Sequence, residues 1–258
     1  YDADADRIEK EVRFKELGEI FNPSWSPDGR LIVFTALHGG HTDLFLHDLQ
    51  AGTTRQLTSD AFADLHPSWG PDNRRLAFVT DRFSTNLPRL IPGDYRIALL
   101  DIADGSIKEV AGTDRGKNIN PQWGPDGGLY FVSDRNGISN VYRTTVEGGT
   151  LSQLTNLATG VSGITDLSPA ISFASGARRL AMSVYENGSY NLYTMDSAEA
   201  LAGKPPVALV SVNAAQLPPA TRVASQYAEL RSNPEVGVPA AADPDRKSTR
   251  LNSSHTIQ

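Results

Sequence analysis

The sequence predicts an all-β chain built from about four copies of one four-stranded antiparallel unit. A tryptophan-containing motif recurs, an apolar β-rich run follows each copy, and glycine-containing turns separate the runs. All three tryptophans of the 258-residue chain, Trp25, Trp69 and Trp123, occupy one motif position and are 44 and 54 residues apart. Because four-stranded propeller blades repeat every roughly 40–50 residues, each copy is predicted to be one blade of a β-propeller.

Each motif contains a turn that reverses the chain after the tryptophan. Proline presets φ, aspartate caps the turn, and the glycine accepts a positive φ. The apolar runs that follow, residues 31–35, 76–80 and 129–133, are typical of a buried second strand. A fourth copy has Ile171 in place of tryptophan and a looser turn. The residues assigned to the repeat are Trp25, Pro27, Asp28, Gly29, Trp69, Pro71, Asp72, Trp123, Pro125, Asp126 and Gly127.

The repeat also sets the expected domain organisation. Residues 1–14 align with the end of the first copy, so they are predicted to be the remnant of an upstream blade. The alternative is an acidic N-terminal helix, which would be marginal in water because it is short and isolated. The four predicted blades cover residues 15–58, 59–112, 113–155 and 156–212.

The blade pattern stops after residue 212. Residues 213–244 are rich in Pro and Ala and are predicted to be a linker, in which residues 220–231 can form one short helix. A linker implies a second domain beyond it; a C-terminal tail without consequence is the alternative. Residues 245–255 read D-R-K-S-T-R-L-N-S-S-H and resemble a translated sequencing adapter. We therefore expect 245–258 to be a disordered artefact, with a genuine polar tail as the alternative.

Composition excludes several function classes. No apolar run approaches the roughly 20 residues that span a bilayer, so this fragment is not expected to be membrane-inserted. The net charge of -6 argues against nucleic-acid binding, and the absence of Cys removes thiol nucleophiles and Cys-based metal sites. His38 and His41 lack the helical register that would aim two ligands at one metal. Ser162 lacks the spacing of a nucleophile elbow. We expect no catalytic residues, no metal and no cofactor.

The candidate binding residues lie at one end of the predicted blades. In an antiparallel meander the turns alternate between two ends, and the longer, irregular connections all fall at one of them. Asp81-Arg82 and Asp134-Arg135 also allow a structural interpretation, in which the aspartate caps a turn beside a solvated arginine. The candidate partner-binding residues are Asp64, His66, Asp81, Arg82, Arg115, Asn118, Asn120, Asp134, Arg135 and Asp166.

The stretch Pro-Ser-Trp-Ser-Pro-Asp-Gly at residues 23–29, with Arg-Gln-Leu-Thr at 55–58 closing the same blade, resembles the WD-repeat-like blades of TolB-type periplasmic β-propellers. The resemblance covers residues 1 to about 212. Residues 59–69 and 156–170 resemble more closely a bacterial subgroup in which the propeller precedes a BamA-type outer-membrane barrel.

This resemblance implies a non-enzymatic, periplasmic protein-binding platform of the bacterial envelope. Its partner would be an envelope protein or a covalently linked downstream domain. Similar blades also occur beside peptidases, so the alternative is the gating propeller of a serine peptidase of the prolyl-oligopeptidase type. A propeller enzyme that acts through its central channel is a further alternative.

Overall fold

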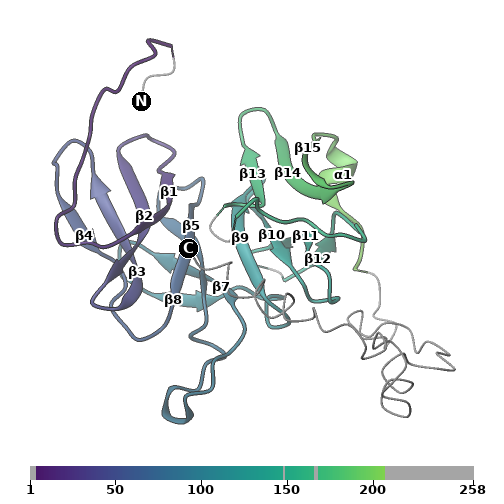
Figure 1. The fold of residues 1–258 in the computed structure, drawn as a ribbon, viewed down its shortest axis with the longest axis horizontal. Helices are drawn as coiled ribbons and strands as arrows, with labels where there is room; N and C mark the ends of the chain where they lie inside the picture. Colours follow the sequence, from purple (N-terminus) through teal and green to yellow (C-terminus); the bar gives the residue numbers. More distant parts are fainter. Residues whose placement is uncertain (1–3, 148, 166–167, 207–258) are drawn as a thin grey trace, which may run out of the picture. The chain divides into compact units, whose positions relative to one another are not determined.

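The computed structural model describes residues 4–147, 149–165 and 168–206 (Figure 1). They belong to the first of two compact units, residues 1–214. The predicted linker at 213–244, its helix at 220–231 and the adapter-like tail at 245–258 lie outside the described residues, so these expectations stay predictions.

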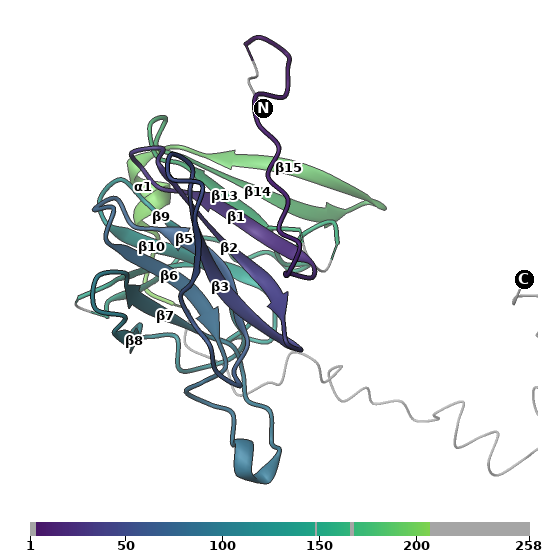
Figure 2. The same ribbon diagram turned by 90° about the vertical axis from the view of Figure 1, so that its left-hand side faces the viewer.

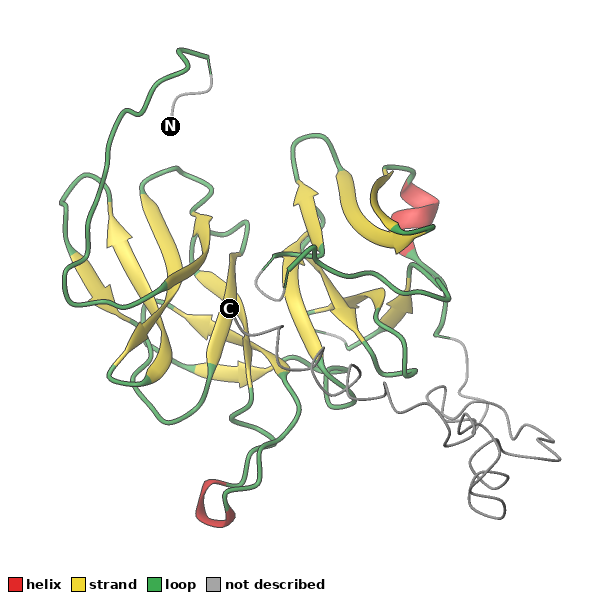
Figure 3. Ribbon diagram, in the orientation of Figure 1, coloured by secondary structure: helices red, strands yellow, loops and turns green. Residues whose placement is uncertain are grey.

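The chain folds into antiparallel sheets, each made of strands that follow one another in sequence, and the all-β propeller prediction is confirmed (Figure 3). The first three sheets have four strands each. The first contains β1 (Ile20–Trp25), β2 (Leu31–His38), β3 (His41–Asp48) and β4 (Thr54–Gln56). The second contains β5 (Asp64–Trp69), β6 (Arg75–Thr80), β7 (Arg96–Asp101) and β8 (Ile107–Glu109). The third contains β9 (Asn118–Trp123), β10 (Gly128–Ser133), β11 (Asn140–Thr145) and β12 (Leu151–Gln153).

The fourth sheet has three strands in the part of the chain that the structure describes. They are β13 (Ile171–Ala174), β14 (Arg179–Glu186) and β15 (Ser189–Met195). After β15 the chain forms the short helix α1 (Ala198–Ala202), and Lys204 then pairs with Gln153 at the outer edge of the third sheet. The chain therefore returns to the preceding sheet after β15.

The turn that follows each tryptophan has the expected chemistry. In the first sheet the Asp28 carboxylate accepts the Arg30 N–H at 3.1 Å, and Gly29 has a φ of 72°. In the second sheet Asn73 takes the glycine position with a φ of 54°. Asparagine tolerates this left-handed conformation better than most residues, so the turn geometry survives the substitution.

The first strand of each four-stranded sheet contains a bulge that the sequence did not reveal. Asn22, His66 and Asn120 have φ values of 48°, 49° and 53°, and each precedes a proline. The pairing with the second strand shifts register at the same place in all three sheets. A bulge bends the strand and redirects its side chains, and in the second and third sheets the Trp that follows it packs against the neighbouring sheet.

Trp69 and Trp123 each join their sheet to the one before it. The Trp69 indole Nε1 donates to the Ser24 carbonyl at 3.1 Å, and the Trp123 indole Nε1 donates to the Ser68 carbonyl at 3.2 Å. Trp69 and Trp123 are each 5% exposed, whereas Trp25 is 57% exposed. The apolar core is accordingly distributed between neighbouring sheets, in clusters that each combine residues of two sheets.

The third and fourth sheets are joined differently, because Ile171 offers no indole N–H. The Ile171 main-chain N–H donates to the Asn120 side chain at 2.8 Å. The rings of Tyr130 and Phe173 lie 4.8 Å apart across the same junction. Ile171 is 2% exposed, so the fourth copy stays packed without its tryptophan.

The segment before β1 packs on the open side of the first sheet. Among residues 4–19 no strand is assigned, and the Phe14 ring lies 5.1 Å from that of Phe34. Leu17 belongs to the same apolar cluster, and the Gly18 N–H donates to the Leu37 carbonyl at 2.8 Å. That residues 1–14 are the remnant of an upstream blade stays a prediction.

Candidate partner-binding face

The irregular connections gather at one end of the sheets, which we call the loop face. Successive connections of an antiparallel sheet alternate between its two ends. The turns after Trp25, Trp69 and Trp123 therefore lie at the opposite end. The loop face is formed by the connections 57–63, 81–95, 110–117, 134–139 and 154–170, of which residues 166–167 are not described.

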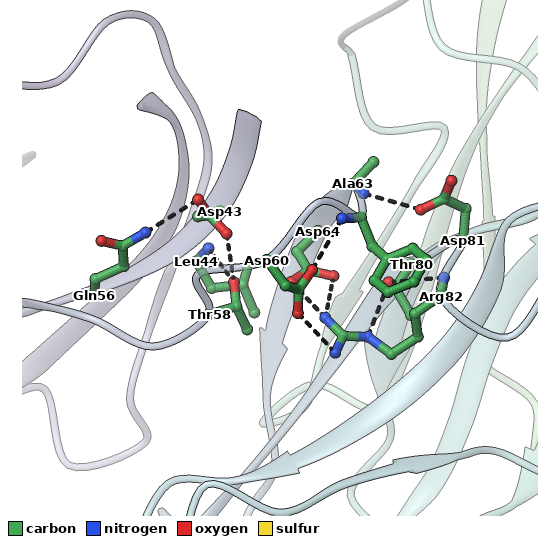
Figure 4. A network of polar contacts seen from close by, with 11 residues as sticks. Asp43, Leu44, Gln56, Thr58, Asp60, Ala63, Asp64, Thr80, Asp81 and Arg82 are labelled. Carbon is green, nitrogen blue, oxygen red and sulfur yellow. Dashed lines mark hydrogen bonds and ion pairs between the residues drawn. The ribbon is translucent and has the colours of Figure 1, made fainter. Parts of the chain in front are cut away.

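The strongest polar network on the loop face is centred on Arg82 (Figure 4). Its guanidinium contacts both carboxylate oxygens of Asp64 at 2.8 and 2.7 Å, and Asp60 at 3.0 Å. Asp64 is 0% exposed, and the Arg82 side chain is 14% exposed. The guanidinium also lies 5.7 Å from the Phe78 ring centroid. Burial raises the pKa of Asp64, while the hydrogen bond and charge of Arg82 oppose that rise.

A second polar group in Figure 4 closes the first sheet. The Thr58 hydroxyl accepts the Leu44 N–H at 3.0 Å and donates to Asp43 at 3.3 Å. The side chain of Gln56 donates to the same carboxylate at 3.0 Å. Thr113 and Thr155 accept main-chain N–H groups of their own third strands in the same way. Sequence reasoning did not identify these threonines, although Thr58 and Thr155 each follow a Gln-Leu pair.

The two Asp-Arg pairs fix loops. The Asp81 carboxylate accepts the Ala63 N–H at 2.9 Å, and that of Asp134 accepts the Lys117 N–H at 2.7 Å. In these bonds each carboxylate holds an N–H of the connection before its own sheet, and not one of its own turn. The arginines are not solvated as the structural interpretation supposed: Arg135 donates to the Gly112 carbonyl at 3.0 Å and is partly buried, which lowers its pKa.

Asn118, Asn120 and His66 are engaged within the scaffold. The Asn118 amide nitrogen has four main-chain carbonyl oxygens within hydrogen-bond distance, and the shortest contacts, to Thr113 and Gly116, are 2.8 Å. The Asn120 N–H donates to His66 Nδ1 at 3.3 Å across the junction between the second and third sheets. Burial lowers the pKa of His66 to about 4, so this ring is neutral near pH 7.

A pocket of about 500 Å³ opens beside His66. Its lining combines the β9 residues Ile119 and Asn120 with Lys117 and with residues of the 154–170 connection. Lys117 is exposed, and Arg115 is exposed nearby in the same connection. Asp166 lies outside the described residues. The structure thus brings His66, Asn120 and Lys117 to one pocket, Asp64 and Arg82 to a separate ion pair, and leaves Arg115 facing solvent.

Neither a metal-binding cluster nor a membrane-spanning helix occurs among the described residues. No group of three or more His, Asp or Glu side chains there could hold a metal ion. His47, near the weak His38–His41 motif, contacts the Thr54 hydroxyl through Nδ1 at 2.9 Å. None of the helices assigned in those residues is long and apolar enough to cross a membrane.

Comparisons with known proteins agree with this fold. A family model described as "TolB beta propeller domain" matches residues 4–86. Dipeptidyl-peptidase 5 of Porphyromonas gingivalis is 25% identical over 158 residues, which make up 56% of this chain and 22% of the relative. The Tol-Pal system protein TolB of Bordetella pertussis is 27% identical over 148 residues, 57% of this chain and 32% of the relative.

The crystal structure of TolB from Acinetobacter baumannii is similar with a TM-score of 0.56 and 23% identity. The match covers 69% of this chain and 41% of that one. The aligned part therefore spans less than half of each of these three proteins.

Proposed function

We propose that this chain, which carries a TolB-type β-propeller domain, is part of a non-enzymatic protein-binding platform in the periplasm of a bacterial envelope. The partner is an envelope protein or a domain linked to the propeller, and it binds at the loop face. The observation that carries this proposal is the pocket beside His66, where β5 and β9 meet three irregular connections, 110–117, 134–139 and 154–170, beside the exposed Lys117.

Some polar residues of the loop face bind the scaffold while others are exposed to solvent, and this arrangement supports binding at the face. The ionic groups of Asp64, Arg82 and Asp134 and the amide NH2 of Asn118 bind the scaffold, so they hold the connections in place. The main chain of such fixed loops loses little conformational entropy when a partner binds. Arg115 and Lys117 are exposed cations on a chain whose net charge is -6, and they favour an acidic group on the partner.

Site-specific photo-crosslinking tests this proposal. A photoreactive phenylalanine analogue is placed at Arg115, on the loop face, in the chain exported to the periplasm of a Gram-negative host. The matched control carries it at Asp104, an exposed residue of the β7–β8 turn at the opposite end. We expect a discrete protein adduct from position 115 alone, and a lower yield when Lys117→Glu is added. An adduct from position 104 alone, or from neither position, would overturn the proposal.

The alternative function is the gating propeller of a serine peptidase. It is favoured by the similarity to dipeptidyl-peptidase 5, which extends over 56% of this chain. Long-read sequencing of the parent gene beyond both ends separates the two. A downstream domain with a G-x-S-x-G nucleophile elbow and later Asp and His residues supports the peptidase gate. Amphipathic outer-membrane strands support the envelope platform.

A further inference from the structure

One connection on the loop face projects beyond the others. The second and third strands are joined by Gly39 and Gly40 in the first sheet and by Asn187 and Gly188 in the fourth, but by residues 81–95 in the second. This hairpin extends away from β6 and β7 and carries the short 3₁₀ helix η1 (Leu87–Arg89) at its far end (Figures 2 and 3). We call residues 86–92 its tip.

The base of the hairpin is braced. The Thr85 hydroxyl donates to the Asp81 carboxylate at 2.5 Å and accepts the Gly93 N–H at 2.9 Å. The Ser84 hydroxyl donates to the Asp94 carbonyl at 2.6 Å. A Cβ on Gly93 would lie 2.3 Å from the Ser84 carbonyl carbon, so the two arms pack too closely for any side chain there. These contacts hold the two arms of the hairpin together at its base.

Four main-chain N–H groups of the tip are paired within the hairpin. Asn86 and Ile91 exchange two N–H···O bonds, of 2.9 and 3.1 Å. The Arg89 N–H is capped by the Asn86 side chain at 3.2 Å, and the Leu90 N–H donates to the Leu87 carbonyl at 3.0 Å. Groups that are already paired do not have to give up water bonds on entering an apolar medium, which is the main cost of burying a polypeptide.

The side chains of the tip are aliphatic and exposed. Leu90 is 87% exposed, Ile91 52% and Leu87 37%, and every residue from 86 to 92 is exposed. Leu90 has φ 53° and ψ 40°, a left-handed conformation that suits glycine or asparagine better than leucine. A strained, exposed leucine stabilises neither the backbone nor the core, so its use at this place points to a contact made outside the chain.

We propose that the tip of this hairpin is a membrane-contact site that dips into the interfacial region of a phospholipid bilayer. Leu87, Leu90 and Ile91 enter the boundary between headgroups and acyl chains, and the Arg89 guanidinium stays at the phosphate level. No acidic residue occurs between Asp81 and Asp94, although the chain has a net charge of -6. The contact is a surface attachment by one hairpin, distinct from a membrane-spanning segment.

The tip fits a lipid surface better than a protein pocket. Protein-binding anchors are enriched in Trp, Tyr and Arg and under-represented in Leu, and the tip has no aromatic residue. The main-chain donors of Asn86, Arg89, Leu90 and Ile91 are used inside the hairpin. The groups of the tip that remain free for an outside contact are its aliphatic side chains and the Arg89 guanidinium. Aliphatic side chains suit the acyl chains of a bilayer, and the guanidinium suits the lipid phosphates above them.

The absence of cysteine from the natural chain makes a direct test simple. Leu90→Cys is labelled with an environment-sensitive nitrobenzoxadiazole fluorophore and mixed with vesicles of phosphatidylcholine, alone or equimolar with phosphatidylglycerol. The control is Arg178→Cys, which occupies an exposed left-handed position, φ 48°, in the β13–β14 turn. We expect a blue-shifted, brighter emission at position 90 alone, and stronger binding with phosphatidylglycerol.

A second variant separates contact from folding. Leu90→Asn removes the aliphatic side chain but suits the left-handed backbone, so its melting temperature should equal or exceed that of the parent. Its partitioning in vesicle flotation should fall about tenfold, the loss expected from one partly buried leucine. Arg178→Asn, at an equally left-handed position, should likewise match or raise the parent melting temperature, and it should leave flotation unchanged.

Several outcomes would overturn the inference. One is an unchanged emission at position 90 with both vesicle types, and another is equal flotation of Leu90→Asn and the parent. A lower melting temperature for Leu90→Asn would instead give Leu90 a structural role. If the tip fails to meet vesicles but position 90, carrying the photoreactive residue, cross-links to the partner captured at Arg115, the tip is part of the protein interface. The platform function then stands without the membrane contact.

Discussion

The hydrogen bonds from tryptophan indoles to carbonyls of the preceding sheet lead to a quantitative prediction about stability. Trp69 is 5% exposed, and its Nε1 donates to the Ser24 carbonyl at 3.1 Å. Replacing a buried tryptophan by alanine costs about 3–5 kcal/mol of unfolding free energy. Trp25 stands at the same repeat position but is 57% exposed, so less than half of its side chain is removed from solvent. Trp25→Ala should therefore cost about 1.5–2 kcal/mol.

The assay is urea unfolding followed by far-ultraviolet circular dichroism, because the substitutions remove the fluorescent side chains. Trp123→Ala serves as a replicate, since Trp123 is also 5% exposed and its indole donates to the Ser68 carbonyl. We expect Trp69→Ala and Trp123→Ala to lower the midpoint by similar amounts, and Trp25→Ala by about half as much. Equal losses at positions 25 and 69 would refute the reasoning, because the cost would then follow residue type and not the contact between neighbouring sheets.

Three further predictions concern charge and pH. Burial lowers the pKa of His66 from 6.5 to about 4, so the folded state resists protonation of this ring. The contribution of His66 to the free energy of unfolding is fully present above pH 6.5 and falls by about 3 kcal/mol as the pH drops to 4. His66→Asn should abolish this loss, as measured by chemical denaturation at a series of pH values. Arg82→Met leaves the buried Asp64 carboxylate unpaired and should cost about 3–5 kcal/mol, whereas adding Asp64→Leu should recover most of it in the same assay. The hydrogen bond from Arg74 lowers the pKa of Asp101, so the Asp101 carboxylate stabilises the fold above about pH 4 and this contribution is lost on further acidification. Asp101→Asn should therefore reduce the fall of the melting temperature at acid pH. An unchanged fall would contradict this assignment.

The parts of the fold that could be predicted from the sequence are those that depend on residues close together in the chain. The Trp and the Pro-Asp-Gly turn depend on neighbouring residues alone, so Gly29 and Asp28 could be assigned their turn roles from spacing. The bulge at Asn22 was not visible, because a positive φ before proline has no strong sequence signal. Asparagine at two of the three equivalent positions is the one available hint.

The candidate site was harder to predict because its contacts join distant segments. Sequence spacing placed Arg82 on the loop face but could not show that it pairs with Asp64, which lies on the adjacent strand of the same sheet. The pairing of Lys204 with Gln153 was equally hidden, since it depends on how the chain turns through α1. Arg115 was correctly placed among exposed loop residues; its binding role stays a prediction.

The outer edge of the fourth sheet bears on how this chain behaves at high concentration. The outer strands of the first two sheets, β4 and β8, are three residues long and carry Arg55, or Lys108 and Glu109. Short, charged edges discourage the addition of further strands. In the described part of the fourth sheet the outer strand is β15, seven residues long with the sequence Ser-Tyr-Asn-Leu-Tyr-Thr-Met and no charge. No strand of residues 4–147, 149–165 or 168–206 pairs with the outer side of β15, so within this part of the chain it is a template for strand addition. Leu192→Lys, at a position that is 78% exposed, should oppose that addition and improve solubility.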